Sequence, residues 1–482
     1  MVRELSRDIT LSLLMNVSTR AANALMFVLI GRSLGAQSAG AFQLALTYLL
    51  IFSVLTRGLD DHVVRQVAQA PQEARRYFTS FAIVRLLANA VLYGFLVILV
   101  LYVIGYPDVT SLVILITGGC IIGDGLASAA NGAMVGLRKF GLPASVALGL
   151  CVSRLFVSGL LMITSKVSIV TVATIWLISS IVSAAFSLVL VERHLRPLPR
   201  WPVWDPELVR HQGSSVRPFI VNGFLMAVQF QVDVILLSMF HGEVEVGFYG
   251  AATTVVSTLA MMSQAYRFAI YPLMAAYAAE SRELVAALHR KSLLYMSTLV
   301  VPMIFGVVLL APSIVDLVFS SQFSESVVVL QILAVTLFFN FLNVPNNRVM
   351  FACERQRWTV WMLAGSMCIN LLLNAWLTPV YGATGAALAR VGSSLLFFVV
   401  NLAVLERLVL KRRIWLSKLL WRPLLAASLM AIVVYLLRDA GLLLLVGVGA
   451  AVYCLAILAI GGIPDGDRRV LSSWLQHRLA VL

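Results

Sequence analysis

The sequence predicts an all-α polytopic membrane protein with about fourteen transmembrane helices, and three observations support this class. The chain has 482 residues, of which 60% are hydrophobic and only 12% charged, whereas soluble proteins have roughly 45–50% apolar and about 25% charged residues. The apolar residues form runs of about 20, the length that a helix needs to cross a bilayer. Basic residues gather in alternate connections between these runs, as in multi-pass proteins.

The predicted helices follow one another along the whole chain. The first starts after Arg3 and Arg7, and it is too long and too polar at its centre for a cleaved signal peptide. We therefore expect it to be retained. Hydropathy places the helices at residues 9–31, 39–57, 78–104, 110–136, 141–165, 168–192, 217–240, 247–271, 293–319, 326–347, 358–379, 383–406, 422–437 and 441–462.

The charges of the connections predict the orientation. With a cytoplasmic N-terminus, most of the 36 Lys and Arg residues fall in cytoplasmic segments, and the outer segments hold only Arg32, Lys166 and Arg438. This bias places both termini in the cytoplasm. The dispersed basic loops would contact anionic membrane lipids, and they exclude nucleic acid as an expected partner.

A proline- and arginine-rich stretch divides the chain into two similar parts. We expect an N-lobe of six helices at 1–192, a cytoplasmic linker at 193–216, a C-lobe of six helices at 217–408, and helices 13–14 with a cytoplasmic tail at 409–482. Residues 29–52 align with 236–259 after a shift of 207 positions, which pairs Gly35 with Gly242 and Gly40 with Gly247. Because six helices return the chain to its starting side, the repeat is predicted to be parallel, with a pseudo-twofold axis along the membrane normal.

Five arginines fall inside predicted helices, where a charge costs at least about 2.5–3.5 kcal/mol: Arg20, Arg85, Arg154, Arg267 and Arg390. In the first helix, Asn16, Arg20 and Asn23 share one face, so Arg20 is expected to face a polar space. The first four arginines would form a cationic cavity wall. Two alternatives stay open: ion pairing, for instance with Asp124, and extension of Arg85 and Arg267 toward the interface.

Three stretches carry a family resemblance: GRSLGAQSAGAF at 31–42, GLDDHVVRQVA at 58–68 and QVDVILLSMFHGEVEVGFYGAATTV at 231–255. In order and position they resemble Wzx-type oligosaccharide flippases, which translocate undecaprenyl-pyrophosphate-linked sugars in polysaccharide and O-antigen biosynthesis. The wider MOP superfamily includes the lipid II flippase and the MATE exporters. The resemblance implies a two-lobed, V-shaped bundle whose central cavity opens alternately to either face.

This resemblance also implies a function without catalysis. The protein would carry a polyprenyl-diphosphate oligosaccharide from the cytoplasmic to the outer leaflet of a bacterial or archaeal plasma membrane. It would act as a monomeric transport unit, with other polysaccharide-assembly membrane proteins as possible partners. Guanidinium groups suit the diphosphate because they form paired, charge-assisted hydrogen bonds. No cofactor is expected, since P-loop, HExxH and CxxC motifs are absent from the sequence.

A second polar cluster is expected in the C-lobe, and it comprises Asp233, Asn370, Asn374 and Arg390. In the lipid II flippase, the equivalent helices hold a sodium ion, so the resemblance implies sodium or proton coupling here. Arg390 departs from that pattern, because a fixed cation could replace sodium by a salt bridge to Asp233. Asp124 belongs to the same set of coupling or gating candidates. On the helix at 326–347, Asn343 and Asn347 suit either sugar hydroxyls or helix–helix hydrogen bonds.

Two other functions compete with a flippase. A MATE-like, cation-coupled exporter of small molecules would use acidic cavity residues, yet intramembrane arginines outnumber Asp124 and Asp233. A polyprenyl-dependent membrane glycosyltransferase or polymerase would resemble proteins with a large external catalytic loop, whereas the predicted outer loops are short.

Overall fold

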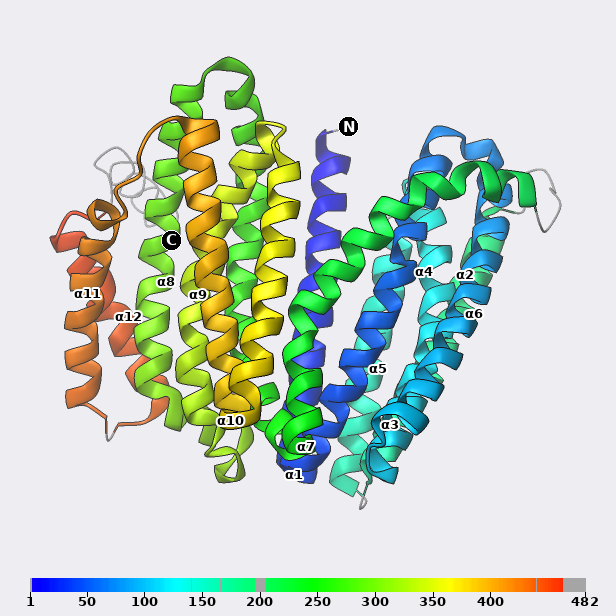
Figure 1. Cartoon of the computed structure of the whole chain (residues 1–482), viewed down its shortest axis with the longest axis horizontal. Coiled ribbons are helices and arrows are strands. Elements are labelled where there is room, and N and C mark those ends of the chain that lie inside the picture. Colours follow the sequence, from blue (N-terminus) through cyan, green and yellow to red (C-terminus); the bar gives the residue numbers. More distant parts are fainter. Residues whose placement is uncertain (1, 140, 165–166, 196–204, 439, 463–482) are drawn as a thin grey trace, which may run out of the picture. The chain divides into compact units, whose positions relative to one another are not determined.

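The computed structural model describes residues 2–139, 141–164, 167–195, 205–438 and 440–462, and these form helices with no strand among them. Eleven helices in the described part are long and apolar enough to cross a membrane (Figure 1). Large apolar side chains such as Phe156 and Leu443 are 69% and 85% exposed, as lipid-facing residues are. The predicted class of all-α, multi-pass membrane protein is confirmed.

Twelve α-helices account for most of the chain, and short helical turns connect or extend them: η1 (Pro71–Glu73), η2 (Leu99–Ile104), η3 (Ser321–Phe323) and η4 (Leu405–Leu410). The α-helices are α1 (Val2–Gln69), α2 (Ala74–Ile98), α3 (Asp108–Gly118), α4 (Cys120–Gly136), α5 (Gly141–Thr164), α6 (Ile169–Leu195), α7 (Pro206–Glu280), α8 (Arg282–Phe319), α9 (Ser326–Ala352), α10 (Gln356–Val404), α11 (Leu416–Leu436) and α12 (Leu442–Ala459).

Three of these helices are interrupted by a glycine with a positive φ angle. Gly35 in α1, Gly242 in α7 and Gly382 in α10 have φ of 82°, 77° and 55°, which favours glycine because a Cβ clashes there. Each interruption falls between two helices that the sequence predicts separately. Since each long helix has room for two spans of about 20 residues, the predicted turns are kinks in this structure. The number fourteen stays a prediction.

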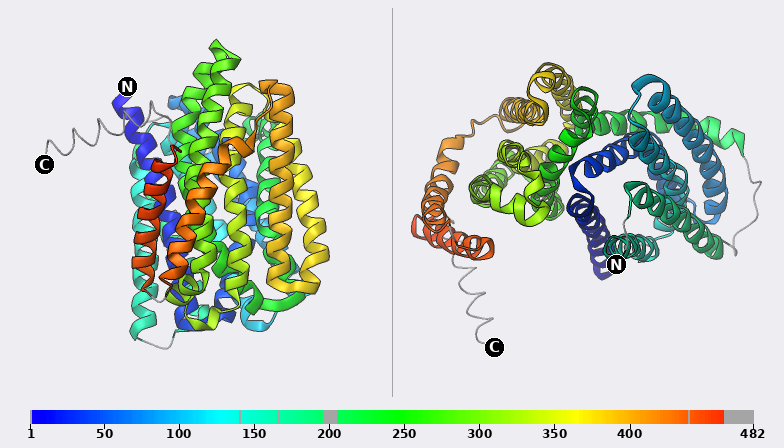
Figure 2. Two further views of the ribbon diagram at one scale, coloured as in Figure 1. Left: turned by 90° about the vertical axis from the view of Figure 1, so that its left-hand side faces the viewer. Right: turned by 90° about the horizontal axis from the view of Figure 1, so that it is seen from below.

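The helices form two compact units. The first unit comprises Met1–Thr254 and Met367–Ala389, and the second comprises Val255–Ser366 and Arg390–Leu482. Both α7 and α10 therefore contribute to each unit. Within each unit the long helices run side by side (Figure 2). These units are groups of residues that pack together, whereas the predicted lobes are continuous stretches of sequence. The lobe boundaries at 192 and 217 therefore stay a prediction.

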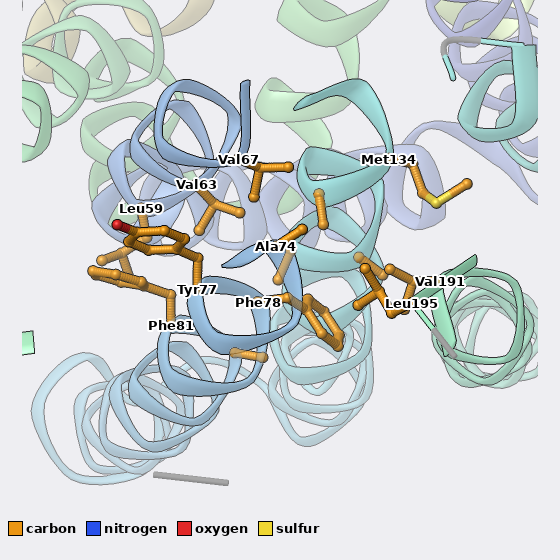
Figure 3. Packing of buried hydrophobic residues seen from close by; sticks show 14 residues of the cluster. Leu59, Val63, Val67, Ala74, Tyr77, Phe78, Phe81, Met134, Val191 and Leu195 are labelled. Atoms are coloured by element: carbon orange, nitrogen blue, oxygen red, sulfur yellow. The ribbon is translucent and has the colours of Figure 1, made fainter. Parts of the chain in front are cut away.

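The first unit is held at one end by an apolar cluster of α1, α2, α4 and α6 (Figure 3). Leu59, Val63 and Val67 follow one another by one turn on α1 and meet the α2 aromatic residues Phe78 and Phe81. On α4 the contributing residues are mostly alanines, which let helices approach closely in a membrane. This packing aligns the polar faces of α1, α2, α4 and α6.

Two glycines bring α1 and α7 together beyond their kinks. Gly40 lies against the backbone carbonyl of Glu243, and Gly247 lies against the carbonyl of Ala36, so closely that a Cβ at either position would overlap backbone atoms. The two contacts exchange under the shift of 207 positions, since Ala36 then corresponds to Glu243 and Gly40 to Gly247. This reciprocity agrees with the predicted repeat at one place, and the full repeat stays a prediction.

The second unit packs around α8. This helix begins after Ser281, whose Oγ accepts a hydrogen bond from the Glu283 backbone N–H at 3.1 Å. It contacts α9, α11 and α12. At the end where α8 begins and α9 ends, an apolar cluster closes the unit, and we call it the second-unit apolar cluster: Ile270, Met274, Val285, Val349, Met350, Met362, Leu405, Val409 and Leu410.

Candidate functional site

Two acidic residues of the first unit pair with arginines inside the helix bundle. The Asp60 carboxylate on α1 forms an ion pair with Arg85 on α2. Asp124 on α4 lies 3.8 Å from the Arg154 guanidinium on α5. Ser128, one turn beyond Asp124 on α4, donates a hydrogen bond of 2.6 Å to Asp60. Asp124 and Ser128 thus lie on one face of α4, and through them this helix contacts both ion pairs.

The Asp60–Arg85 pair belongs to the interior of the unit. Arg85 is 4% exposed. Asn89, one turn away, accepts a hydrogen bond from Thr56 at 2.9 Å and donates to the Ile121 carbonyl at 2.8 Å. These contacts favour ion pairing for Arg85, one of the alternatives that the sequence leaves open, over a place at the cavity mouth.

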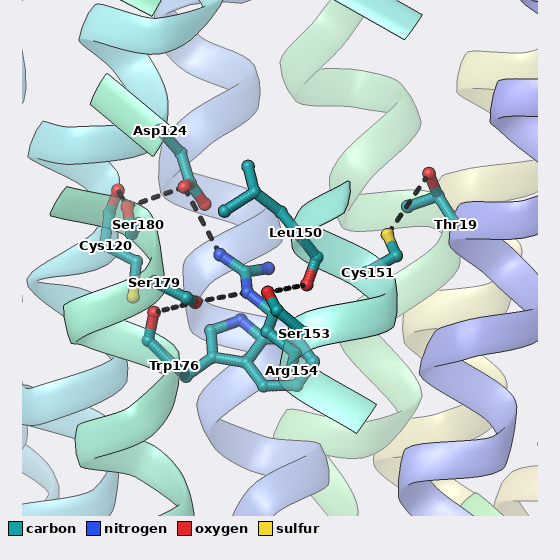
Figure 4. Close-up of polar contacts among 10 residues, drawn as sticks. All are labelled: Thr19, Cys120, Asp124, Leu150, Cys151, Ser153, Arg154, Trp176, Ser179 and Ser180. Carbon is teal, nitrogen blue, oxygen red and sulfur yellow. Dashed lines mark hydrogen bonds and ion pairs between the residues drawn. The ribbon is translucent and has the colours of Figure 1, made fainter. Parts of the chain in front are cut away.

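The Arg154 guanidinium is oriented by three groups (Figure 4). Its Nε donates to Ser179 on α6, its Cζ lies 4.6 Å from the centre of the Trp176 ring, and its Nη2 approaches Asp124. Ser180 donates to the same Asp124 oxygen at 2.6 Å. The side chains of Arg154 and Asp124 are 16% and 39% exposed. A loose, partly exposed ion pair can exchange its carboxylate for another anion, whereas the buried Arg85 pair cannot easily do so.

A small recess brings predicted residues of two helices together beside this ion pair. It is shallow and open to the outside, and it is lined by Ala22, Asn23, Met26, Cys151, Arg154, Leu155 and Trp176. The Cys151 thiol donates to Thr19 Oγ1 at 3.8 Å, which holds α5 against α1. Asn23 and Arg154 thus share one recess. Trp176 is not among the residues predicted from the sequence, because nothing in its own helix marks it.

Arg20 lies one turn before Asn23 on α1, and both side chains are exposed. Within the described part of the chain, Arg20 forms no ion pair. Arg20 is therefore an exposed arginine that no described carboxylate neutralises, one helical turn from the recess residue Asn23. The side chain of Asn16, the third member of the predicted face, lies outside the described residues.

Arg267 and Arg390 lie in the second unit, on α7 and α10, and both are half-buried. The Arg390 carbonyl accepts a hydrogen bond of 3.1 Å from Ser393. Asp233 belongs to the first unit. The predicted salt bridge between Arg390 and Asp233 therefore stays a prediction, as does a common cationic wall of Arg267 with Arg20, Arg85 and Arg154.

Three members of the predicted second cluster come together: Asp233, Asn370 and Asn374. Asp233 is fully buried and accepts hydrogen bonds from Tyr249 Oη at 2.7 Å and from Asn374 Nδ2 at 3.0 Å. Asn374 also bonds to the Asn370 carbonyl, and Thr378 donates to Asn374 Oδ1 at 3.0 Å. Tyr249 and Thr378 were missing from the predicted set. Thr378 follows Asn374 by four residues, so helical spacing could have found it.

The same geometry bears on the sodium ion that the family resemblance implies. Sodium needs a cage of oxygen atoms, but both oxygens of Asp233 accept hydrogen bonds and Asn374 presents its nitrogen. The arrangement satisfies the Asp233 carboxylate with protein donors, and sodium coupling stays a prediction. Among the described residues, no group of three or more His, Cys, Asp or Glu side chains could hold a metal.

The arrangement of helices defines the class of protein. It resembles the lipid II flippase MurJ in an inward closed conformation, with a TM-score of 0.77, 16% identity and coverage of 93% of this chain and 98% of that one. It also resembles an inward-facing multidrug resistance MATE transporter of the MOP superfamily, with a TM-score of 0.66, 12% identity and coverage of 82% and 95%. The fold is thus that of the MurJ and MATE transporters.

The chain belongs to the polysaccharide biosynthesis protein family, whose model matches residues 5–278. The MatE model matches residues 218–376. A curated relative is the probable low-salt glycan biosynthesis flippase Agl15 of Haloferax volcanii, which is 28% identical over 171 residues. The aligned part spans 35% of this chain and 35% of that relative.

Proposed function

We propose that the protein is a flippase that carries a polyprenyl-diphosphate-linked oligosaccharide from the cytoplasmic to the outer leaflet of a plasma membrane. It acts as a secondary-type transporter by alternating access and performs no catalysis. The family match, the flippase relative and the MurJ fold support a lipid-linked glycan as the cargo. The observation that carries the proposal is the loose Asp124–Arg154 ion pair beside Asn23, with the exposed Arg20 one turn before Asn23 on α1.

The charges of this site suit a diphosphate. Arg85 is neutralised by Asp60 in the interior, so Arg154 in the recess and the exposed Arg20 on α1 are the candidates for binding an anion. A diphosphate carries several acceptor oxygens, and guanidinium groups bind such groups through paired hydrogen bonds. Its oxygens would first meet Arg20 and then displace Asp124 from Arg154. Since the Asp124 pair is long at 3.8 Å, this exchange loses little.

The sugar would lie beside the same recess. Trp176 is buried and holds the guanidinium with its ring face. Asn23 adds an amide with donors and an acceptor for hydroxyl groups. The diphosphate end is assigned to the mouth of this recess, beside Arg154, and the sugars extend away from it.

Reconstitution tests this function against the MATE-like alternative. Purified protein in proteoliposomes receives a fluorescent polyprenyl-diphosphate sugar, and a quencher added outside reports the fraction that has changed leaflet. A fluorescent organic cation is offered in parallel vesicles. Movement of the lipid-linked sugar with no uptake of the cation supports the proposal. Cation uptake without lipid movement would instead identify an exporter.

A further inference from the structure

A buried histidine of the second unit has an unused ring nitrogen. His289 on α8 and Asn346 on α9 are both fully buried. The His289 Nε2 lies 2.8 Å from Asn346 Oδ1, and an amide oxygen only accepts, so this ring nitrogen carries the proton. His289 Nδ1 and Asn346 Nδ2 have no hydrogen-bond partner among the described residues. Each buried atom left unpaired costs about 1–3 kcal/mol.

A second polar group lies beside this pair on α9. Asn401 of α10 donates from Nδ2 to Asn343 Oδ1 at 3.1 Å and to Asn347 Oδ1 at 2.9 Å. Its own Oδ1 is buried without a partner in the described part. Because Asn346 lies between Asn343 and Asn347, the two groups form one layer across α8, α9 and α10. Of the two roles predicted for Asn343 and Asn347, the contacts with Asn401 are helix–helix hydrogen bonds.

The polar layer is covered by apolar side chains at one end of the unit. Val285, Met350 and Leu405 belong to the second-unit apolar cluster. They lie four residues, or about one helical turn, from His289, Asn346 and Asn401 respectively, and all toward the end where α8 begins and α9 ends. The layer is therefore separated from that end by one apolar turn on each of the three helices.

We propose that His289 is a proton-binding site within the second unit. A proton from water adds to the lone pair of Nδ1, which turns the neutral imidazole into an imidazolium and leaves the Nε2–H bond to Asn346 in place. A proton suits the site because it needs no cavity, whereas a sugar hydroxyl or a metal ion needs space that fully buried side chains do not leave. The amides of the layer provide dipoles for the new charge.

Several charged and titratable groups on the elements around α8 have contacts of their own. Arg290 and Lys291 on α8 are exposed, and Arg267 lies next to Tyr266 on α7. Arg348 lies over the Tyr271 and Phe351 rings. Tyr266 donates a hydrogen bond to Ser292, and Glu406 accepts one from the Ile414 N–H. Tyr453 and Arg422 donate to the carbonyls of Thr298 and Gly461 respectively. Asn346 is the hydrogen-bond partner of His289, so the site is built without a carboxylate.

Protonation would change the packing of the layer. The imidazolium carries a second N–H that must find an acceptor, and a buried charge favours opening of the apolar turn that covers it. This step can couple transport to a pH gradient, and that role rests on the proposed function. The binding of the proton to His289 does not rest on it.

A measurement on the ring tests the site directly. Protein labelled with ¹⁵N-histidine is placed in nanodiscs, and the ring nitrogens are followed by NMR from about pH 4 to 9. His289→Gln identifies the His289 signal among the six histidines. We expect Nδ1 of His289 to titrate within this range. In Asn346→Asp the midpoint should rise by about 1–3 pH units, because a carboxylate beside the ring stabilises the imidazolium.

Transport then tests the coupling. Proteoliposomes with an imposed pH gradient should flip the lipid-linked sugar faster than those without one, and His289→Gln should lose that stimulation while keeping its basal rate. His62→Gln is the matched control, because His62 is also buried and packs 4.9 Å from the Phe81 ring in the first unit. It should keep the stimulation.

Three results separate the two proposals. A His289 ring that stays neutral over the whole pH range overturns the proton site. A full pH-gradient response in His289→Gln overturns the coupling role. Titration of His289 in a protein that flips no lipid-linked sugar contradicts the proposed function alone and leaves the proton site in place.

Discussion

The guanidinium of Arg154 lies 3.8 Å from the Asp124 carboxylate, while Ser180 donates to that carboxylate at 2.6 Å. Asp124 therefore keeps a protein partner when its arginine is taken by another anion. This relationship makes the pair suited to exchange.

Asp124→Asn is expected to strengthen diphosphate binding, because the mutation removes the anion that competes for Arg154. Arg154→Gln should weaken binding about 10-fold, as expected for one lost charged hydrogen bond of about 1.5 kcal/mol. Titration with a short-chain polyprenyl diphosphate in detergent measures both effects. Ser153→Ala is the control, since this neighbour is exposed. Equal affinities in all four proteins would contradict anion exchange.

Arg20→Gln is expected to reduce the flipping rate and leave thermal stability unchanged, because the side chain is exposed and forms no ion pair within the described part. Arg32→Gln, another exposed arginine of α1, should transport like the wild type. Both rates are measured in the vesicle assay, and melting is followed in detergent. A loss of stability in Arg20→Gln would instead assign this residue a structural role.

The Asp60–Arg85 pair should behave as a structural element. Arg85→Met leaves a buried carboxylate without its partner and is expected to cost about 3–5 kcal/mol of stability. The double variant Asp60→Leu/Arg85→Met should recover most of this loss, since no unpaired charge remains. Thermal unfolding of the two single variants and the double variant forms the cycle. Additive losses would show that the two residues act independently.

Gly40→Ala and Gly247→Ala are expected to destabilise the protein by roughly 1–3 kcal/mol, because the added methyl group meets backbone atoms that cannot rotate away. Gly94→Ala provides the comparison: a Cβ there has no neighbour within 4 Å, and alanine favours helix. Melting temperatures of the three variants are compared. Unchanged stability in the first two would mean that α1 and α7 separate without cost.

Replacing sodium by potassium on both sides of the vesicle is expected to leave the flipping rate unchanged. The reason is that Tyr249 and Asn374 already satisfy the Asp233 carboxylate. The measurement uses wild-type protein with no pH gradient, so that proton coupling does not enter. A rate that rises with sodium and loses that dependence in Asp233→Asn would show that the cluster rearranges to bind the ion.

Much of the fold was predictable from local sequence. Apolar runs of membrane length and the glycines at 35, 242 and 382 mark where helices form and where they turn. The polar contacts were less predictable, because a helix face shows that Arg85 points inward but not which carboxylate it meets. Asp60 and Arg85 come from α1 and α2, and only the packing of these helices shows that they form a pair.

The sequence by itself determined that the chain is helical, crosses a membrane and places costly arginines inside it, because hydropathy and charge act at each residue. Tertiary structure decided which of those arginines stay reachable. Arg85 is neutralised in the interior, Arg154 is held loosely beside Trp176, and Arg20 remains exposed. It also decided that His289 meets Asn346. These outcomes depend on distances between helices that are far apart in the sequence, and pairing energy changes steeply with such distances.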